Sequence, residues 1–270
     1  MVATLASLGV DTSTCAWIFS FLSDRSVFFH FNSFSSQSFT PLCGTPQGSP
    51  LSPILSTIFT SPLFQLCLEG PGDPDLSLYV DDGCIFAASE TFSGVITKLQ
   101  RLASLCGEWL TRVGLCIDSE KSELLFFHPP RPSRHKGIPP TSVPFSFGTS
   151  SFSLKPAPYI RYLGIFFTPT LTWGVHVQAL STRAHSSLRA LCVLGNTIRS
   201  LSLVSWRRIV SSIIIPILTY GAETWFTDIR QSSYVDTLQV ALNEACRNVG
   251  GVFRTTPSHL VHKLVAIPPI

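Results

Sequence analysis

The hydrophobic positions of this 270-residue chain change period about two-thirds of the way along it. Up to residue 168, helical stretches stand among short runs that alternate as strands do, such as 76–80 and 84–88. Beyond Thr170 the pattern is helical, and its first apolar stripe has spacings of 3, 4, 4 and 3 residues: Val177, Leu180, Ala184, Leu188 and Leu191. The pattern predicts an α+β part followed by an all-α part.

Local signals predict the individual elements. Asp11 is suited to cap a helix that runs through residue 21, with Trp17, Ile18 and Phe21 as its apolar stripe. Six prolines in 128–144 predict a connecting loop. The other predicted elements are a strand over 27–34, a helix from Leu51 with Ile54, Leu55, Ile58 and Phe59 on the same face, a helix over 93–113 with Val95, Leu99, Leu102 and Leu110 on one side, a strand over 116–127, two strands over 145–154, a strand pair over 159–167, and helices over 203–222 and 231–249.

Composition narrows the class of protein. Hydrophobic residues make up 45% of the chain and charged residues 13%. No uninterrupted apolar run reaches the roughly 18 residues that indicate a membrane span. The best run, 209–222, is broken by polar residues and Pro216, so we interpret it as a buried helix too short to span a bilayer and expect no membrane partner. No basic residue precedes the apolar N-terminal run and Asp11 interrupts it, which favours an intracellular protein of the cytoplasm or nucleus, not a secreted one.

Cysteine and histidine give little indication of a metal centre. The eight cysteines contain no CxxC pair, which argues against a zinc module or a disulfide framework and favours reduced, small core residues. His259 and His262 are close enough in sequence to share a ligand, but no Cys or acid accompanies them. We therefore expect both histidines at the surface.

Charge is divided unevenly along the chain. Before Lys98 one basic residue, Arg25, stands against eight acids, a net charge of −7, and from Lys98 onward the net charge is +10. Such a division suggests an acidic part that holds cations and a basic part that holds a polyanion. Solvated faces with no ligand explain the same division, and both explanations stay open. Four arginines fall on predicted helices of the basic part, suited to a nucleic-acid backbone or to solvent: Arg183, Arg189, Arg207 and Arg208.

The stretch LSLYVDDGCIFAAS sets two adjacent carboxylates, Asp81 and Asp82, between two apolar strands. Asp82-Gly83 is typical of a type I′ hairpin turn, because Gly tolerates positive φ. Alternation along the first strand puts Ser77, Tyr79 and Asp81 on one face. Two carboxylates at a hairpin tip also form half of a site for Mg²⁺, which prefers hard oxygen ligands. From these residues alone, a plain turn and a metal site both remain open.

A second motif, GTPQGSPLSP over 44–53, precedes the helix that starts at residue 51. Gly44 and Gly48 permit close backbone approach, and Pro46 stiffens the turn between them. Gln47 carries an amide that can bond a base, a sugar or a phosphate. A Gly/Pro turn that merely starts a helix explains the same residues, so the motif by itself leaves its function open.

GTPQGSPLSP followed about thirty residues later by YVDD resembles the reverse transcriptases of non-LTR (LINE-type) retrotransposons. WIFSFLSDR resembles the helix before the family's GxPQG loop, SEKSELLFF its strand with a conserved Lys, YLGI its primer-grip hairpin, and ILTYGAETW and GVFRTTP its thumb and post-thumb segments. The resemblance implies a partial polymerase right-hand palm, an antiparallel sheet with packed helices, followed by an all-α thumb. It implies partial fingers and palm over 1–168, the thumb over 169–250 and a post-thumb connector over 251–270.

The resemblance also implies a reaction, two-metal nucleotidyl transfer to a primer 3′-hydroxyl, with an RNA template, a DNA primer and dNTPs as partners. It implies these roles: Asp81 and Asp82 as carboxylates of a site for Mg²⁺, with Mn²⁺ possible; Lys121 near the leaving pyrophosphate as an acid; Gly44, Pro46, Gln47 and Gly48 lining the pocket for template and incoming nucleotide; Tyr79 beneath the primer end; and Tyr162, Leu163 and Gly164 as the primer grip. An exposed lysine in a run of charges explains Lys121 as well. The oligomeric state is not predicted.

One carboxylate of the implied site has no match. The family's third carboxylate comes from a D-x-x-x-A-F-D motif upstream of the GxPQG loop, and the acids before Gly44 are Asp11, a predicted helix cap, and Asp24, in a helix-ending SDR. We expect a fragment truncated at both ends, with an incomplete metal site and negligible polymerase activity by itself. Two alternatives are a non-catalytic nucleic-acid-binding remnant of a transposon and an unfolded gene relic whose cut sheet exposes strand edges.

Overall fold

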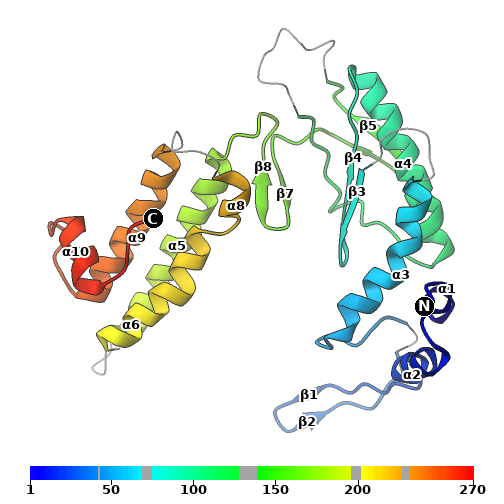
Figure 1. The fold of residues 1–270 in the computed structure, drawn as a ribbon, viewed down its shortest axis with the longest axis horizontal. Coiled ribbons are helices and arrows are strands. Elements are labelled where there is room, and N and C mark those ends of the chain that lie inside the picture. The colour runs from blue at the N-terminus through cyan, green and yellow to red at the C-terminus, as the bar shows by residue number, and fades with distance from the viewer. Residues whose placement is uncertain (42, 69–74, 128–138, 196–201, 227–231) are drawn as a thin grey trace. The chain divides into compact units, whose positions relative to one another are not determined.

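The computed structural model describes residues 1–41, 43–68, 75–127, 139–195, 202–226 and 232–270 (Figure 1). The chain divides into two compact units: unit 1, Met1–Ser122 with Lys136–Lys155, and unit 2, Glu123–His135 with Pro156–Ile270. Most of the predicted proline-rich loop lies outside the described residues. The mixed α+β class is confirmed: among the described residues, helices and strands both precede residue 168, and only helices follow it.

Unit 1 combines helices with short hairpins. Its described elements are α1 (Val2–Ser7), α2 (Thr12–Leu22), β1 (His30–Phe31), β2 (Phe34–Ser35), α3 (Leu51–Leu68), β3 (Asp75–Tyr79), β4 (Asp82–Phe86), α4 (Phe92–Arg112), β5 (Val143–Phe147) and β6 (Ser150–Leu154). All strand pairing among them is antiparallel and stays within hairpins, so the described residues form separate two-stranded sheets and no larger palm sheet.

Helix α3 contributes to two hydrophobic clusters of this unit. Its first half places Leu55 in a cluster with Leu5, Cys15 and Ile18 from α1 and α2. Its second half contributes to a cluster with α4 that contains Leu63, Cys67, Leu102, Cys106 and Trp109. The side chains of α3 thus tie the N-terminal helices to the segment that carries β3 and β4.

The predicted cap of α2 is confirmed. The carboxylate of Asp11 accepts hydrogen bonds from the hydroxyls of Ser13 and Thr14 and from the backbone N–H of Thr14 at 2.9 Å. These bonds, that of the Ser13 hydroxyl first, hold the pKa of the Asp11 carboxyl far below its usual range. The predicted stripe is correct in part, because Ile18 is buried but Trp17 is 55% exposed and stacks on Phe21.

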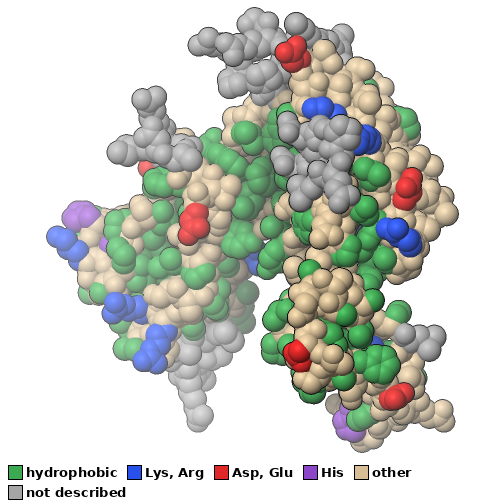
Figure 2. All heavy atoms as spheres, turned by 45° about the vertical axis from the view of Figure 1, so that its right-hand side comes forward, with side chains coloured by type: hydrophobic (Ala, Val, Ile, Leu, Met, Phe, Trp, Pro, Cys, Tyr) green, Lys and Arg blue, Asp and Glu red, His purple; other side chains and the backbone are tan. Residues whose placement is uncertain are grey.

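The single strand predicted over 27–34 is wrong, because the chain reverses at residues 32 and 33. Phe31 pairs with Phe34 across that turn, and an isolated bridge joins Val27 to Phe39. Phe31 is 75% exposed and Phe34 is 65% exposed. The alternation of apolar and polar residues in this stretch therefore does not correspond to a buried face. Figure 2 shows hydrophobic side chains over much of the face that it draws.

Unit 2 has one large core. Its described elements are β7 (Ile160–Tyr162), β8 (Ile165–Phe167), α5 (Gly174–Gly195), α6 (Leu203–Ile209), the π-helical segment η2 (Val210–Ile214), α7 (Ile215–Leu218), α8 (Ala222–Trp225), α9 (Ser232–Gly250) and α10 (Ser258–Val265). The predicted stripe of α5 is confirmed, since Val177, Leu180, Ala184 and Leu188 are buried and Leu191 packs against them. The strand pairs predicted over 145–154 and 159–167 are confirmed as well.

The helix predicted over 203–222 changes from α-helical to π-helical hydrogen bonds at η2, and α7 ends at Leu218. Val210, Ile214 and Leu218 are fully buried in the core, but Val204, Ile213 and Tyr220 are exposed, so the predicted buried helix is buried on one side only. The segment Leu203–Trp225, with a mean hydropathy of 1.3, is nevertheless long and apolar enough to cross a membrane by length and composition alone. The prediction concerned only the shorter run 209–222, and core helices of soluble proteins pass the same test.

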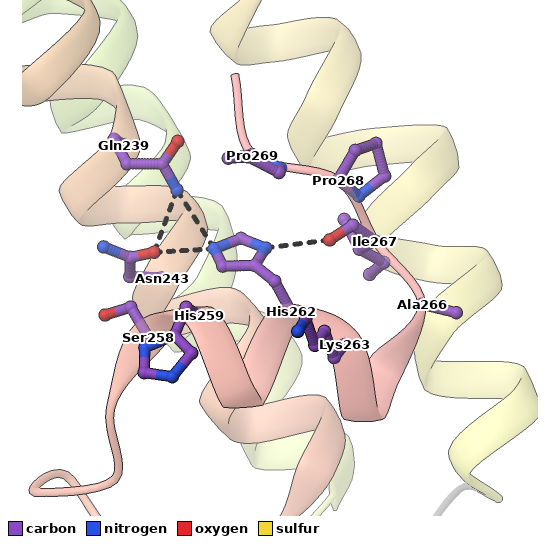
Figure 3. Close-up of a pocket in the computed structure, with 10 residues that line it drawn as sticks. All are labelled: Gln239, Asn243, Ser258, His259, His262, Lys263, Ala266, Ile267, Pro268 and Pro269. Carbon is purple, nitrogen blue, oxygen red and sulfur yellow. Dashed lines mark hydrogen bonds between the residues drawn. The ribbon is translucent and has the colours of Figure 1, made fainter.

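His262 is buried, and the expectation of a surface position was wrong for it. Its Nδ1 lies 2.8 Å from the carbonyl oxygen of Ile267, and its Nε2 lies 2.7 Å from Asn243 Oδ1 and 3.1 Å from Gln239 Nε2 (Figure 3). These bonds join α9, α10 and the C-terminal segment, a tertiary contact that local sequence does not reveal. His259 is exposed, as expected.

The cysteines are all free thiols, as the sequence indicated. Burial raises the pKa of Cys106 to about 12 and that of Cys246 to about 11, so both remain protonated. The expected core position is wrong for Cys43 and Cys116, which are exposed.

Candidate functional site

The carboxylate hairpin turns two residues earlier than the Asp82-Gly83 signal predicted. Tyr79 pairs directly with Asp82, so Val80 and Asp81 form the two-residue turn and Asp82 begins β4. Val80 has φ 57°, in the left-handed region, and Asp81 does not. A β-branched residue is rarely found there, because its Cβ crowds the backbone. The turn next to Asp81 is therefore held in a strained conformation.

The two faces of this hairpin differ in their environment. Leu76, Leu78 and Ile85 pack against the α3–α4 cluster. Gly83 pairs with Leu78 across the hairpin, and a Cβ at Gly83 would lie 3.1 Å from Leu78 Cδ2. Packing, not turn geometry, is what favours glycine at this position.

The opposite face carries the polar side chains of the motif. Tyr79 and Asp82 pair across the strands and so share that face. Ser77 and Cys84 form the next pair on the same face. The predicted face of Ser77, Tyr79 and Asp81 is corrected, because Asp81 lies in the turn and Asp82 takes its place beside Tyr79. Tyr79 is 61% exposed.

The carboxylates of Asp81 and Asp82 are both exposed. Their oxygens are of the kind that Mg²⁺ and Mn²⁺ prefer. In the described ranges, however, no group of three or more His, Cys, Asp and Glu side chains is placed to hold a metal ion. Asp11 caps α2, and Asp24 follows the end of that helix with φ 50°. Within the described ranges, Asp81 and Asp82 therefore lack a third side chain of this kind to complete a metal site.

The GTPQGSP loop is held at two points, with its turn left exposed. Arg25 donates to the carbonyl oxygen of Gly44 at 2.7 Å and to that of Leu22 at 3.1 Å. At the other side, Ser52 in the first turn of α3 donates to the carbonyl oxygen of Pro46. Gln47 between these points is exposed, so its amide is accessible to a ligand. Sequence reasoning missed the role of Arg25, although it is the only basic residue before Lys98.

Helix α3 connects the loop to the carboxylate hairpin. It begins at Leu51, directly after the loop, and its second half packs against the hairpin through the cluster that includes Leu63 and Leu78. In Figure 1 the turn of the β3–β4 hairpin points toward the same end of unit 1 as the N-terminus of α3. The two motifs are thus carried by one packed scaffold.

Lys121 does not lie on a strand. Residues 116–127 form a turn and irregular segments, with one isolated bridge between Leu124 and Pro156. The side chain of Lys121 is 86% exposed, and its Nζ lies 3.3 Å from Asp118 Oδ2. The N–H of Glu120 and then the Lys121 ammonium lower the pKa of the Asp118 carboxyl. The predicted strand is therefore wrong, and the role of Lys121 as an acid remains a prediction.

The YLG segment forms the turn of the β7–β8 hairpin in unit 2. Tyr162 pairs with Ile165, which leaves Leu163 and Gly164 as the turn residues, with φ 47° and φ 81°. Positive φ at both positions is the type I′ geometry that matches the twist of a hairpin. Sequence reasoning missed Tyr220, whose hydroxyl donates to the carbonyl oxygen of Leu163 at 2.7 Å.

The four arginines of unit 2 differ in their contacts. Arg207 donates to the carbonyl oxygen of Ala266 at 2.9 Å, which joins α6 to the C-terminal segment. Arg183, Arg189 and Arg208 are exposed on helices. The hydrogen bond of Arg207 to the protein backbone gives this residue a structural role. The other three arginines are accessible to a polyanion.

A glutamine-bearing glycine loop and a carboxylate turn on one scaffold, in a chain that continues into a helical bundle, are features of a nucleotide-polymerising protein. The sequence profile of the family described as reverse transcriptase (RNA-dependent DNA polymerase) matches residues 2–167, and the chain belongs to this family.

Relatives in Drosophila melanogaster point to the same class. The chain is 27% identical over 209 residues to the probable RNA-directed DNA polymerase from transposon BS, which covers 76% of this chain and 22% of the relative. It is 25% identical over 251 residues to that from transposon X-element, covering 92% of this chain and 26% of the relative. The polymerase from mobile element jockey is 23% identical over 238 residues, 86% of this chain and 24% of the relative. The chain thus spans about a quarter of the length of these distant homologues among non-LTR retrotransposon polymerases.

Proposed function

We propose that this chain is the palm and thumb part of an RNA-directed DNA polymerase of a non-LTR retrotransposon, and that it holds an RNA template with its DNA primer. The observation that carries the proposal is the α3 scaffold, which joins the exposed Gln47 loop to the Asp81–Asp82 hairpin. The relatives named above, described as RNA-directed DNA polymerases, support it.

Each exposed group of the scaffold has a role in this proposal. Gln47 contacts the template or the incoming nucleotide through its amide. Tyr79 offers an exposed ring beneath the primer end, where a base or sugar can pack on it. Asp81 and Asp82 contribute carboxylate oxygens toward the divalent metal used by the family. Lys121 is a proton donor near the leaving pyrophosphate.

The metal requirement limits what the described residues do alone. A polymerase metal site must fix two ions in a defined geometry. Two exposed carboxylates on a hairpin tip do not fix it, and among the described residues no further acid lies with them. We therefore expect binding of a primed template without appreciable extension.

Two measurements on the full chain test the proposal. Fluorescence anisotropy with a labelled primed RNA is expected to show binding that weakens steeply with salt, because basic side chains displace counterions from phosphates. An extension assay with the same primed RNA, dNTPs and Mg²⁺ is expected to show negligible incorporation. Absence of binding would contradict the proposal, and robust incorporation abolished by Asp81→Ala would contradict the expected inactivity.

A matched pair of variants separates phosphate binding from general charge loss. Arg208→Gln removes an exposed cation from α6. We expect the slope of log affinity against log salt concentration to become less steep by about one unit. Arg101→Gln, in unit 1, removes the same charge from α4 and serves as the control. Equal loss of affinity in both variants would indicate unspecific attraction. That outcome would favour the second candidate, a non-catalytic nucleic-acid-binding remnant, which the incomplete set of carboxylates also favours.

A further inference from the structure

The turn of the β7–β8 hairpin interlocks with the segment between α7 and α8. Gly164 has no side chain, and a Cβ there would lie 3.0 Å from the ring of Tyr220. Gly221, with φ 68°, has a Cβ position only 2.9 Å from Ile165 Cδ1. Each segment thus places a glycine where the other presents a large side chain.

Hydrogen bonds fix the same contact. Tyr220 donates its hydroxyl hydrogen to the carbonyl oxygen of Leu163 at 2.7 Å, across 57 residues of sequence. The carbonyl oxygen of Tyr220 in turn lies 3.0 Å from the indole N–H of Trp225, which donates to it. Trp225 is 2% exposed and belongs to the core of unit 2. The hydroxyl and the carbonyl oxygen of Tyr220 therefore connect the turn to the core.

His176, on α5 and fully buried, contacts both partners. Its Nδ1 accepts the backbone N–H of Phe166 at 3.5 Å, and its Nε2 lies 3.2 Å from the carbonyl oxygen of Tyr220. These two bonds assign the proton of the neutral ring to Nε2. The longer bond to Phe166 is the weaker one, so Tyr220 carries the main link to the turn itself.

We propose that Tyr220 is a positioning residue for the primer: by holding the Leu163 carbonyl it fixes the Tyr162–Leu163–Gly164 turn on the helical core of unit 2, and the fixed turn sets where the primer 3′ end is held. This inference rests on the proposed function, which assigns the turn to the primer. Tyr220 acts through the turn, and its 47% exposed ring is not required to touch nucleic acid. A free two-stranded hairpin is marginally stable, so a rigid primer contact needs such an anchor.

The variant Tyr220→Phe removes the hydroxyl and keeps the ring that packs on Gly164. We expect the turn amides to exchange hydrogen about 3- to 10-fold faster, the size of one lost neutral hydrogen bond. A primer with 2-aminopurine at its 3′ end reports the environment of that base. We expect its fluorescence change on binding to be lost, while the overall affinity for primed RNA stays within about twofold, since phosphate contacts dominate affinity.

Tyr159→Phe is the matched control. Tyr159 precedes the same hairpin, its ring packs edge-on against Phe166 at 5.8 Å, and it is about as exposed as Tyr220, at 46%. Its hydroxyl makes no hydrogen bond within the part of the chain that the structure describes. We expect Tyr159→Phe to leave both the exchange of the turn and the 2-aminopurine signal as in the unmodified chain.

The outcomes separate this inference from the proposed function. Unchanged exchange in Tyr220→Phe would show that the hydroxyl does not fix the turn. Faster exchange with an unchanged 2-aminopurine signal would show that the fixed turn does not position the primer; either result overturns the inference while binding persists. If the unmodified chain binds no primed RNA, the proposed function fails first and the primer role of Tyr220 fails with it.

Discussion

Two hairpins in this chain carry residues that we assign to polymerisation, and the two are anchored to the protein at opposite ends. The β3–β4 hairpin is anchored by its strands, because Leu76, Leu78 and Ile85 pack into the α3–α4 cluster while its turn is exposed. The β7–β8 hairpin is anchored at its turn, where the Tyr220 hydroxyl holds the carbonyl oxygen of Leu163. One hairpin has an exposed tip, and the other has its tip fixed by protein.

The backbone of each turn fits that difference. Gly164 occupies the left-handed region at φ 81°, where glycine is not strained, beside a ring that leaves no room for a Cβ. Val80 occupies the same region at φ 57°, where a branched side chain is strained. Strain of this kind is found preferentially at functional positions, and here it lies next to Asp81. Leu163 also lies in this region, at φ 47°, so both turns carry strain, and they differ in that the β-branched residue stands beside Asp81.

Gly164→Ala should break the fixed turn and is expected to have the largest effect. A Cβ in the left-handed region costs about 1 kcal/mol or more, and contact with the Tyr220 ring at 3.0 Å adds about 1–3 kcal/mol of overpacking. We expect the free energy of unfolding of unit 2 to fall by about 2–4 kcal/mol. Urea unfolding followed by tryptophan fluorescence measures it.

Gly251→Ala is the control for backbone strain alone. Gly251 also lies in unit 2 with positive φ, 58°, but a Cβ there meets no atom within 4 Å. We expect a loss of about 1 kcal/mol. Equal losses in the two variants would mean that Tyr220 yields without cost, and the turn would not be fixed in the sense argued here.

Val80→Asn tests the strain that we assign to the turn of the β3–β4 hairpin. Asn tolerates the left-handed region because its side chain is unbranched at Cβ and bonds the local backbone. We expect the free energy of unfolding of unit 1 to rise by about 1 kcal/mol, measured through the fluorescence of Trp109 in the cluster beneath the hairpin. Val80→Ala removes the branching but keeps the Cβ and should give a smaller gain. A loss of stability in both variants would contradict the assignment of strain to Val80.

The sequence predicted local structure well and tertiary structure poorly, and the two hairpins show why. The cap of α2 by Asp11 and the stripe of α5 depend on neighbours within a few residues, so periodicity and capping chemistry found them. The turn of β3–β4 was misplaced because Gly83 serves the packing of Leu78, a contact between two strands. The burial of His262 likewise depends on hydrogen bonds to α9 and the C-terminal segment.

The candidate site shows the same division. GTPQGSP and YVDD could be recognised because their residues are consecutive. Arg25 bonds Gly44 across 19 residues, and Tyr220 bonds Leu163 across 57. Contacts at such separations leave no periodic signal in a single sequence, although a lone basic residue among eight acids marks Arg25 as unusual. Motifs thus revealed the groups that we propose to contact a ligand, and not the groups that hold them in place.

A pH titration should also distinguish the two hairpins, and its expected effect on stability is the smallest of these predictions. Burial lowers the pKa of His176 below its usual value of 6.5, and the neutral ring accepts the N–H of Phe166 in β8. As the pH falls through about 6.5, the unfolded chain binds a proton that the folded chain does not, so stability falls with decreasing pH. Between about pH 7 and pH 6 one such histidine changes stability by at most about 0.7 kcal/mol.

Hydrogen exchange gives this measurement an internal control. The protection of the Phe166 amide should decrease with falling pH relative to amides of β3 and β4, whose partners in the described structure include no histidine. Taking the ratio within one sample removes the intrinsic pH dependence of exchange. His176→Gln should abolish the change in the ratio, because glutamine does not titrate in this range. A ratio that stays constant in the unmodified chain would mean that His176 does not support β8.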